Sequence, residues 1–259
     1  MAWTRASSID RTLQCLGSQW VENNFPEVRN VSRSEGLISA GDWGTMVHWW
    51  KETGKVDGSI SHMKTFQKKL DFLEKEGVTR ETLWPADGFH EISVAFNCED
   101  RRVAISWEGE GNDWKAGYSH PWITGTLDYV KLENGVEGAT LVVDDLKTGA
   151  SFDKTPAELA QTYFYLMCLE KVFHTNRDCI SSITHWTKYP VEGLPNRMTD
   201  VFPIELLHRF EERLVSDYKK YQSITAPIDK SLFKLGNECQ FCNVKKANLC
   251  PISEGYQGE

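Results

Sequence analysis

The segment Gly125–Gly149 reads GTLDYVKLENGVEGATLVVDDLKTG, and its pattern decides the fold of the surrounding chain. Two extended runs, 125–132 and 139–147, flank a turn rich in glycine and asparagine. These residues tolerate positive φ, so the pattern predicts a β-hairpin. Folding the hairpin about the centre of the turn sets Leu132 opposite Leu141.

The same pairing brings charged side chains together. Asp128 lies opposite Asp145, and Lys147 shares a strand face with Asp145 because side chains alternate along a strand. Two carboxylates and an ammonium on one patch suit a hard divalent cation, with the lysine beside it to orient a nucleophile or to stabilise negative charge. The alternative is a solvated hairpin edge with ordinary charges.

The composition indicates a globular protein. Its 259 residues, 40% of them hydrophobic, suit one large domain or a domain with appended segments. No apolar run is long enough to cross a bilayer, and the first residues lack the apolar segment of a signal peptide. We therefore expect a cytoplasmic protein, without membrane association, whose seven cysteines are reduced thiols or metal ligands. The net charge of −8 argues against nonspecific coating of nucleic acid but is compatible with a local basic groove.

Hydrophobic periodicity divides the chain into helical and extended segments. The pattern predicts helices over 7–20, 41–54, 61–77, 155–172 and 203–222. It predicts strands over 91–97, 102–107, 125–132, 139–147 and 179–187. The first four strands are expected to form an antiparallel meander, with residues 108–120 as a glycine-rich loop that borders a substrate groove or is a plain surface insertion. The expected fold class is mixed α/β, with a central, mostly antiparallel sheet flanked by helices.

A cysteine motif lies near the C-terminal end of the sequence. Cys239-x-x-Cys242 can bind one metal from a single turn, and Cys250 follows at loop distance. Cys15, at the other end of the chain, is our candidate for the fourth ligand. Zinc or an iron–sulfur cluster would each satisfy four thiolates, and unligated cysteines in a tail are the alternative.

Several motifs occur together along the chain. They are Gly44–His48, Gly125–Asp128, Asp145–Lys147 with Thr148-Gly149, Gln161–Tyr165, and the split cysteine set. In this order they resemble the glycine-to-histidine helix, G-x-x-D, D-x-K-T-G and Q-x-x-x-Y motifs of the PD-(D/E)XK nuclease superfamily, in its RecB-like branch. The cysteines resemble those of its iron–sulfur members, such as the AddB-type recombination nucleases and the CRISPR adaptation exonucleases. The resemblance runs from the first to the last of the four cysteines and implies a restriction-endonuclease-like core.

Some positions depart from the family pattern. The first cysteine is followed by Leu16, where the family usually has proline. A second acid, Asp144, precedes Asp145, but alternation puts Asp144 on the face opposite Lys147, so we assign the site to Asp145. Glu91, at the start of the first predicted strand, is either an accessory acid or a surface glutamate.

The resemblance implies a role for each matched residue. His48, Asp128 and Asp145, with the backbone carbonyl of Leu146, would hold Mg²⁺ or Mn²⁺, and the imidazole favours Mn²⁺. A water bound to that ion would have a lowered pKa, and the scissile phosphate would be polarised. Lys147 would orient the hydroxide or stabilise the pentavalent phosphorane.

The resemblance also implies roles for a helix and for the cysteines. Gln161 and Tyr165 would position the substrate or the catalytic lysine. A structural [4Fe–4S] cluster, with zinc as the alternative, would pin the N-terminal helix and the tail near a DNA groove on four ligands: Cys15, Cys239, Cys242 and Cys250.

The function that follows is a metal-dependent DNA nuclease, an exonuclease on single strands or duplex ends, in recombination, repair or DNA processing. We expect one nuclease domain over 1–259, with a helical part at 1–85, a core at 88–190, and a C-terminal helix with the cysteine tail at 200–255. No Walker-type motif occurs, so a separate helicase, recombinase or annealing protein would supply any motor or partner function, in a bacterial or phage-infected cell. The alternatives are a non-catalytic DNA-binding or scaffold module with a structural metal, and a hydrolase of RNA.

Overall fold

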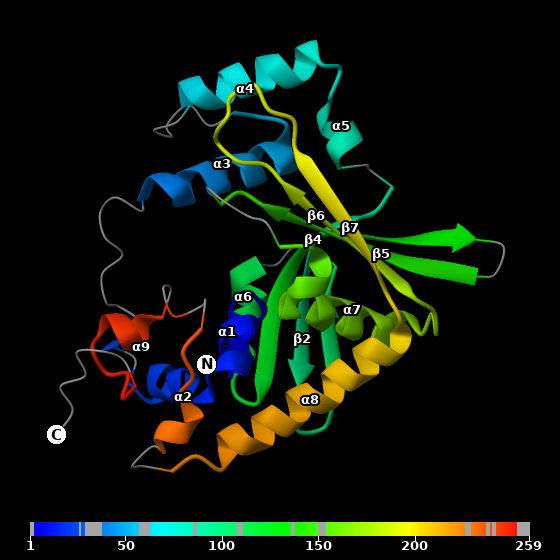
Figure 1. Cartoon of the computed structure of the whole chain (residues 1–259). Helices are drawn as coiled ribbons and strands as arrows, with labels where there is room; N and C mark the ends of the chain where they lie inside the picture. Colours follow the sequence, from blue (N-terminus) through cyan, green and yellow to red (C-terminus); the bar gives the residue numbers. More distant parts are fainter. Residues whose placement is uncertain are drawn as a thin grey trace.

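The fold is a mixed α/β structure built on one central sheet flanked by helices, as the sequence predicts (Figure 1). This computed structural model describes residues 3–25, 27–28, 38–56, 63–84, 87–107, 111–135, 138–149, 154–225, 229–236, 239 and 242–252. Among these residues, seven strands form the sheet in the order β3-β2-β4-β5-β6-β7, and β1 pairs with β4. The β1–β4 and β5–β6 pairs are parallel and the others are antiparallel.

The elements have the following bounds. The strands are β1 Thr4–Arg5, β2 Phe89–Asn97, β3 Val103–Ser106, β4 Trp122–Gly135, β5 Gly138–Lys147, β6 Cys179–His185 and β7 Asn196–Phe202. The α-helices of the described chain are α1 Ile9–Gln14, α2 Leu16–Asn24, α3 Ile38–Thr53, α4 Met63–Lys75, α5 Arg80–Leu83, α6 Gly111–Ala116, α7 Ala160–Phe173, α8 Ile204–Gln222 and α9 Asn243–Lys246. None of these helices is both long enough and apolar enough to span a bilayer.

The central hairpin has the predicted register. Leu132 pairs with Leu141, and the β4–β5 ladder runs from Tyr129 opposite Asp144 to Gly135 opposite Gly138. Residues 136–137, at the centre of the predicted turn, lie outside the described residues. These four strands are antiparallel as expected, but the predicted meander is wrong: β4 pairs with β2 rather than with β3, so the order is β3-β2-β4-β5 and β3 lies outside β2. On the other side of the hairpin, β6 runs parallel to β5, since α7 carries the chain back between them.

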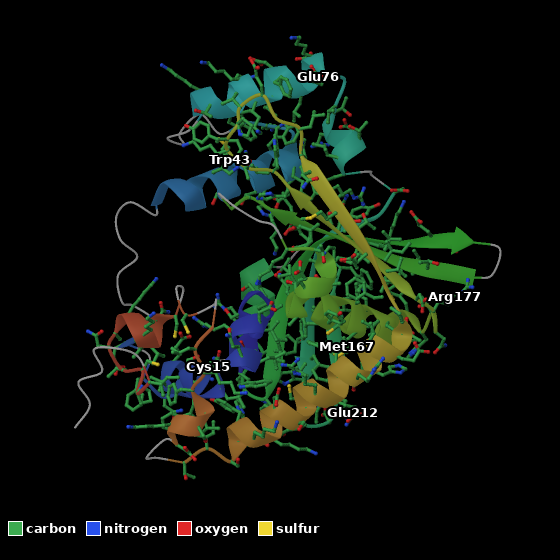
Figure 2. All side chains as sticks on the ribbon, in the orientation of Figure 1. Cys15, Trp43, Glu76, Met167, Arg177 and Glu212 are labelled. Atoms are coloured by element: carbon green, nitrogen blue, oxygen red, sulfur yellow. The ribbon has the colours of Figure 1, made fainter. Side chains whose placement is uncertain are left out.

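Two hydrophobic clusters hold the helices in place. The larger cluster joins the sheet to α7, α8 and the N-terminal residues, and includes Trp3, whose ring centre lies 5.0 Å from that of Tyr218. The smaller cluster fastens α3 and α4 to the ends of β5 and β6, and Figure 2 shows Trp43 between these two helices. In this cluster the ring centre of Trp186, just after β6, lies 5.7 Å from that of Phe66. The backbone carbonyl of Trp186 accepts a hydrogen bond from Trp43 Nε1 at 3.1 Å.

The helix and loop boundaries differ from the sequence prediction at several places. The first helix is interrupted at Cys15, where φ −143° and ψ 84° are not helical, so this cysteine lies between α1 and α2 rather than inside one helix. The cap predicted at Thr155 forms only a 3₁₀ turn over Pro156–Glu158, and α7 begins after it. The predicted loop at 108–120 contains α6, and β7 was not predicted.

Removing the Trp186 side chain should destabilise the protein strongly. The residue is fully buried among aromatic side chains, so Trp186→Ala should lower the free energy of unfolding by about 3–5 kcal/mol. Chemical denaturation followed by circular dichroism measures this change. Tyr189→Ala is the matched control, because that ring is 63% exposed and its loss should change stability by less than about 0.5 kcal/mol. Equal effects of the two substitutions would contradict the packing described here.

Candidate active site

One face of α3 carries a histidine and a lysine toward the sheet. His48 and Lys51 are three residues apart and therefore lie on one side of the helix. Trp43, Met46 and Val47 are buried in the smaller aromatic cluster and fix the rotation of the helix. Gly44 allows a close approach, since a Cβ there would lie 2.8 Å from Thr148 Oγ1 just after β5. This contact explains the glycine that precedes the histidine.

Three acids lie on neighbouring strands below this helix face. Glu91 comes from β2, Asp128 from β4 and Asp145 from β5. His48 Nδ1 lies 3.6 Å from Asp128 Oδ1 and 3.8 Å from Glu91 Oε1. His48, Glu91 and Asp128 each offer one ligand atom, and these three atoms all lie within 4.8 Å of one another, a spacing that can hold a metal ion. Burial opposes the charged imidazole, but the two carboxylates raise the pKa of His48 above 6.5.

Glu91 belongs to this group of residues that could hold a metal, in the place where the sequence analysis expected Asp145. The sequence left it as an accessory acid or a surface residue, and the side chain is in fact only 26% exposed. Its φ of +54° is uncommon for a non-glycine residue and interrupts the β2–β4 ladder between His90 and Ile92. The ladder numbering sets Glu91 opposite Asp128. The approach of Glu91 to Asp128 follows from the β2–β4 register, and no local sequence pattern predicts that register.

Lys51 is a functional candidate that the sequence reasoning missed. Its side chain is 1% exposed, and Nζ donates a hydrogen bond to the Asp128 carbonyl at 2.7 Å. The same ammonium lies 3.4 Å from Glu91 Oε1 and 3.8 Å from Asp128 Oδ1. It therefore offsets negative charge beside the ligand group. The sequence feature that could have identified Lys51 is its position three residues after His48, which places both side chains on one side of the helix.

Asp145 and Lys147, both on β5, form an ion pair next to Asp128. Lys147 Nζ lies 2.5 Å from Asp145 Oδ2, and both side chains are largely buried. Burial and the neighbouring Asp128 raise the pKa of Asp145, although the lysine opposes this. Burial alone would lower the pKa of Lys147, but the charges of Asp145 and Asp128 outweigh it and raise that pKa. Asp128 Oδ2 also accepts a hydrogen bond from the Leu146 backbone N–H at 2.5 Å. The Leu146 carbonyl as a metal ligand stays a prediction.

Asp144 points away from this pair, as alternation along the strand predicts. Its carboxylate accepts a hydrogen bond from Thr184 Oγ1 at 3.0 Å and lies 3.0 Å from Arg197. Burial raises the pKa of Asp144 to about 6 despite the arginine. The choice of Asp145 over Asp144 as the partner of Lys147 is therefore confirmed geometrically.

A hydrogen-bond chain from α7 orients Lys147. Lys147 Nζ donates to Gln161 Oε1 at 2.9 Å, and Gln161 Nε2 donates to the Tyr165 hydroxyl at 3.0 Å. Tyr165 in turn donates to the Thr126 carbonyl at 2.7 Å. Gly125 permits this approach, because a Cβ there would lie 2.7 Å from the Tyr165 ring. The structure thus brings the predicted glutamine and tyrosine to the lysine.

The four predicted cysteine ligands line one cavity between the two ends of the chain. Cys15 from the α1–α2 junction faces it together with three residues of the C-terminal segment: Cys239, Cys242 and Cys250. Figure 2 shows Cys15 beside this segment. Among the described residues, no three of these sulfurs lie within 4.8 Å of one another, whereas the sulfurs of a four-thiolate zinc site are about 3.8 Å apart. Three cations also line the cavity: Arg11, Lys234 and Lys245.

The chain was compared with protein-family models and with curated proteins. No protein-family model matches the chain, and no curated protein is significantly similar to it. The functional interpretation therefore rests on the residues and geometry described above.

Replacing Glu91 should weaken divalent-cation binding. Glu91→Gln keeps the shape of the side chain but removes one of the anionic ligands, so Mn²⁺ affinity should fall at least roughly tenfold, as measured by isothermal titration calorimetry. Glu74→Gln, an exposed position on α4, is the control and should bind Mn²⁺ like the unmodified protein. If Glu91→Gln lowered only the melting temperature and left Mn²⁺ affinity unchanged, Glu91 would serve as a partner of Lys51 and not as a ligand.

Proposed function

We propose that this protein is a metal-dependent nuclease that hydrolyses phosphodiester bonds of DNA. The convergence of a possible metal-ligand group, His48, Glu91 and Asp128, with the buried Asp145–Lys147 pair supports this function most directly. These groups come from three parts of the chain: α3, β2 and the β4–β5 hairpin. An arrangement that buries so many charges is costly for stability and is typical of functional sites.

The donor set fits Mg²⁺ or Mn²⁺. Carboxylate oxygens are the ligands that both ions prefer, and a single imidazole favours Mn²⁺. His48, Glu91 and Asp128 would hold the ion, with Asp145 next to Asp128 as a further ligand. A bound divalent ion supplies Lewis acidity toward a phosphate oxygen and lowers the pKa of a coordinated water.

The protein's own residues would do the remaining work. The raised pKa of Lys147 keeps its ammonium protonated, so it can donate to a phosphate oxygen that gains negative charge. Gln161 limits the rotation of that ammonium, and Tyr165 holds Gln161. Lys51 keeps the Asp128 backbone and the Glu91 carboxylate in place. These two lysines approach the carboxylates from different elements, α3 and β5.

The cysteines would carry a structural iron–sulfur cluster. Four thiols line one cavity, and three cations beside them would offset the charge of a thiolate-bound cluster. The Gly236 N–H also donates to Cys239 Sγ at 3.3 Å, a contact typical of cluster ligands. Zinc after a small rearrangement of the thiols is the alternative.

Substrate and partners follow from the same proposal. DNA is the expected substrate, either as single strands or at duplex ends, and a separate helicase, recombinase or annealing protein would work with the nuclease. A non-catalytic DNA-binding module is the second candidate, although the charged pair of Asp145 and Lys147 has no evident use in such a module. RNA remains a further substrate to test.

The nuclease proposal predicts loss of cleavage when the buried pair is broken. Asp145→Asn and Lys147→Met should each reduce the digestion of labelled DNA, with Mg²⁺ or Mn²⁺, by about a hundredfold or more, since each removes charge at the reacting phosphate. EDTA should abolish digestion by the unmodified protein. Asp144→Asn is the matched control and should retain cleavage, because that carboxylate faces Thr184. Undiminished cleavage by Asp145→Asn would show that the site is assigned wrongly.

The cysteine proposal predicts a coloured protein. After anaerobic purification, the protein should absorb broadly in the visible range and contain iron and acid-labile sulfide. Cys15→Ser and Cys242→Ser should each remove most of the absorbance and lower the melting temperature by similar amounts, because both thiols line the cavity. Cys179→Ser, buried in β6 in the larger hydrophobic cluster and not among the cavity lining, should keep the colour. A colourless protein with stoichiometric zinc would overturn the iron–sulfur assignment.

A further inference from the structure

A groove of about 970 Å³ extends from the candidate active site across the N-terminal part of the molecule. At one end it is lined by Gln161 and Tyr165, the residues that hold Lys147. Its floor includes β4 residues Thr124–Thr126, which lead directly to Asp128. Its other end reaches Asn243, next to Cys242. The groove therefore connects the charged site with the cysteine cavity.

The lining of this groove is basic, in contrast to the chain's net charge of −8. Arg5, Arg11 and Lys115 line it, and Glu22 is the one acid among the described lining residues. Arg11 already pairs with Glu22 at 2.9 Å. Arg5 and Lys115 form no ion pair with a carboxylate in the part of the chain that the structure describes. Two positive charges therefore line the groove without a carboxylate at ion-pair distance, and the charge of Glu91 offsets that of Lys115 only in part.

These two cations lie along the same stretch of β4. Arg5 pairs in register with Thr124, and Lys115 Nζ donates a hydrogen bond to Thr126 Oγ1 at 2.9 Å. Burial and the charge of Arg5 lower the pKa of Lys115, and the charge of Glu91 opposes this only in part, so the two cations repel each other. An anionic ligand between them would remove that repulsion. A polyanion whose charges follow one another along a line suits this arrangement.

An aromatic surface lies beside the cations. Tyr118 lines the groove, and its ring centre is 4.5 Å from that of Trp114 and 4.9 Å from that of Trp122. The neighbouring rings restrict Tyr118, so it offers a preformed platform to a flat ligand. Sites for single-stranded nucleic acid combine a basic track with aromatic rings on which bases stack.

We infer that this groove binds a single polynucleotide strand and leads it to Lys147, with phosphates at Arg5 and Lys115 and a base on Tyr118. This inference rests on the proposed nuclease function and specifies its substrate as single-stranded. Base stacking on Tyr118 requires unpaired bases, and the groove volume is at the upper end of about 300–1,000 Å³ found for small-ligand pockets, which accommodates a few nucleotides. A duplex has to separate its strands before one of them can enter.

Binding can be measured apart from cleavage. In an Asp145→Asn background, fluorescence anisotropy with a short fluorescein-labelled oligodeoxythymidylate should show salt-dependent binding, and a blunt duplex should bind more weakly. Arg5→Gln and Lys115→Gln should each weaken binding and reduce the slope of log affinity against log salt by about 0.7. Tyr118→Leu should weaken binding about fivefold or more with an unchanged slope. The double variant Lys64→Gln/Lys68→Gln, with exposed lysines on α4, should bind like its parent.

A second measurement does not depend on folding of the variants. Photocrosslinking of the parent Asp145→Asn protein to a strand that contains 5-iodouracil should label peptides from residues 3–8 and 114–126. Unchanged binding by the Arg5, Lys115 and Tyr118 variants, labelling elsewhere, or equally tight duplex binding would overturn the inference. Failure of the nuclease proposal would look different: the unmodified protein would cleave no DNA with Mg²⁺ or Mn²⁺, whether or not the groove variants weaken binding.

Discussion

The mutual repulsion of three neighbouring carboxylates is the constraint on which the rest of this structure depends. Glu91, Asp128 and Asp145 lie on adjacent strands in a partly dehydrated region, where like charges interact more strongly than in water. Two lysines compensate from different directions. Lys51 reaches Asp128 and Glu91 from α3, and Lys147 contacts Asp145 along β5. A divalent cation bound to His48, Glu91 and Asp128 would complete this compensation, which gives the site a physical reason to bind one.

Contacts with the surrounding helices fix the positions of these two lysines. The aromatic cluster around Trp43 and Trp186 fastens α3 to the ends of two strands, so the position of Lys51 is set by residues remote in sequence. On the other side, α7 holds Lys147 through Gln161 and Tyr165. The basic groove begins at these same α7 residues and ends near the cysteine cavity. The candidate site, the groove and the cysteine cavity therefore adjoin one another, and Arg11 lines both the groove and the cavity.

The sequence predicted those features that depend on near neighbours in the chain. The turn residues between two short strands determine the hairpin register, which is why Leu132 and Leu141 pair as expected. The role of Glu91 was left open, because its approach to Asp128 depends on a positive φ and on the register of two strands joined by a long segment. The break at Cys15 was also missed, since serine caps and apolar spacing predict one continuous helix there.

By itself, the sequence determined the fold class, the central hairpin and the set of acids, lysine and cysteines, because periodicity and turn chemistry act over a few residues. It did not determine the strand order, in which β4 pairs with β2 rather than with β3. The tertiary structure alone decided which of these groups meet. Lys51 and Asp128 are 77 positions apart, and Cys15 lies 217 positions from Leu232, whose carbonyl it approaches. Such contacts arise only when whole helices and strands pack, since the burial of their apolar faces, rather than any local preference, brings the polar groups together.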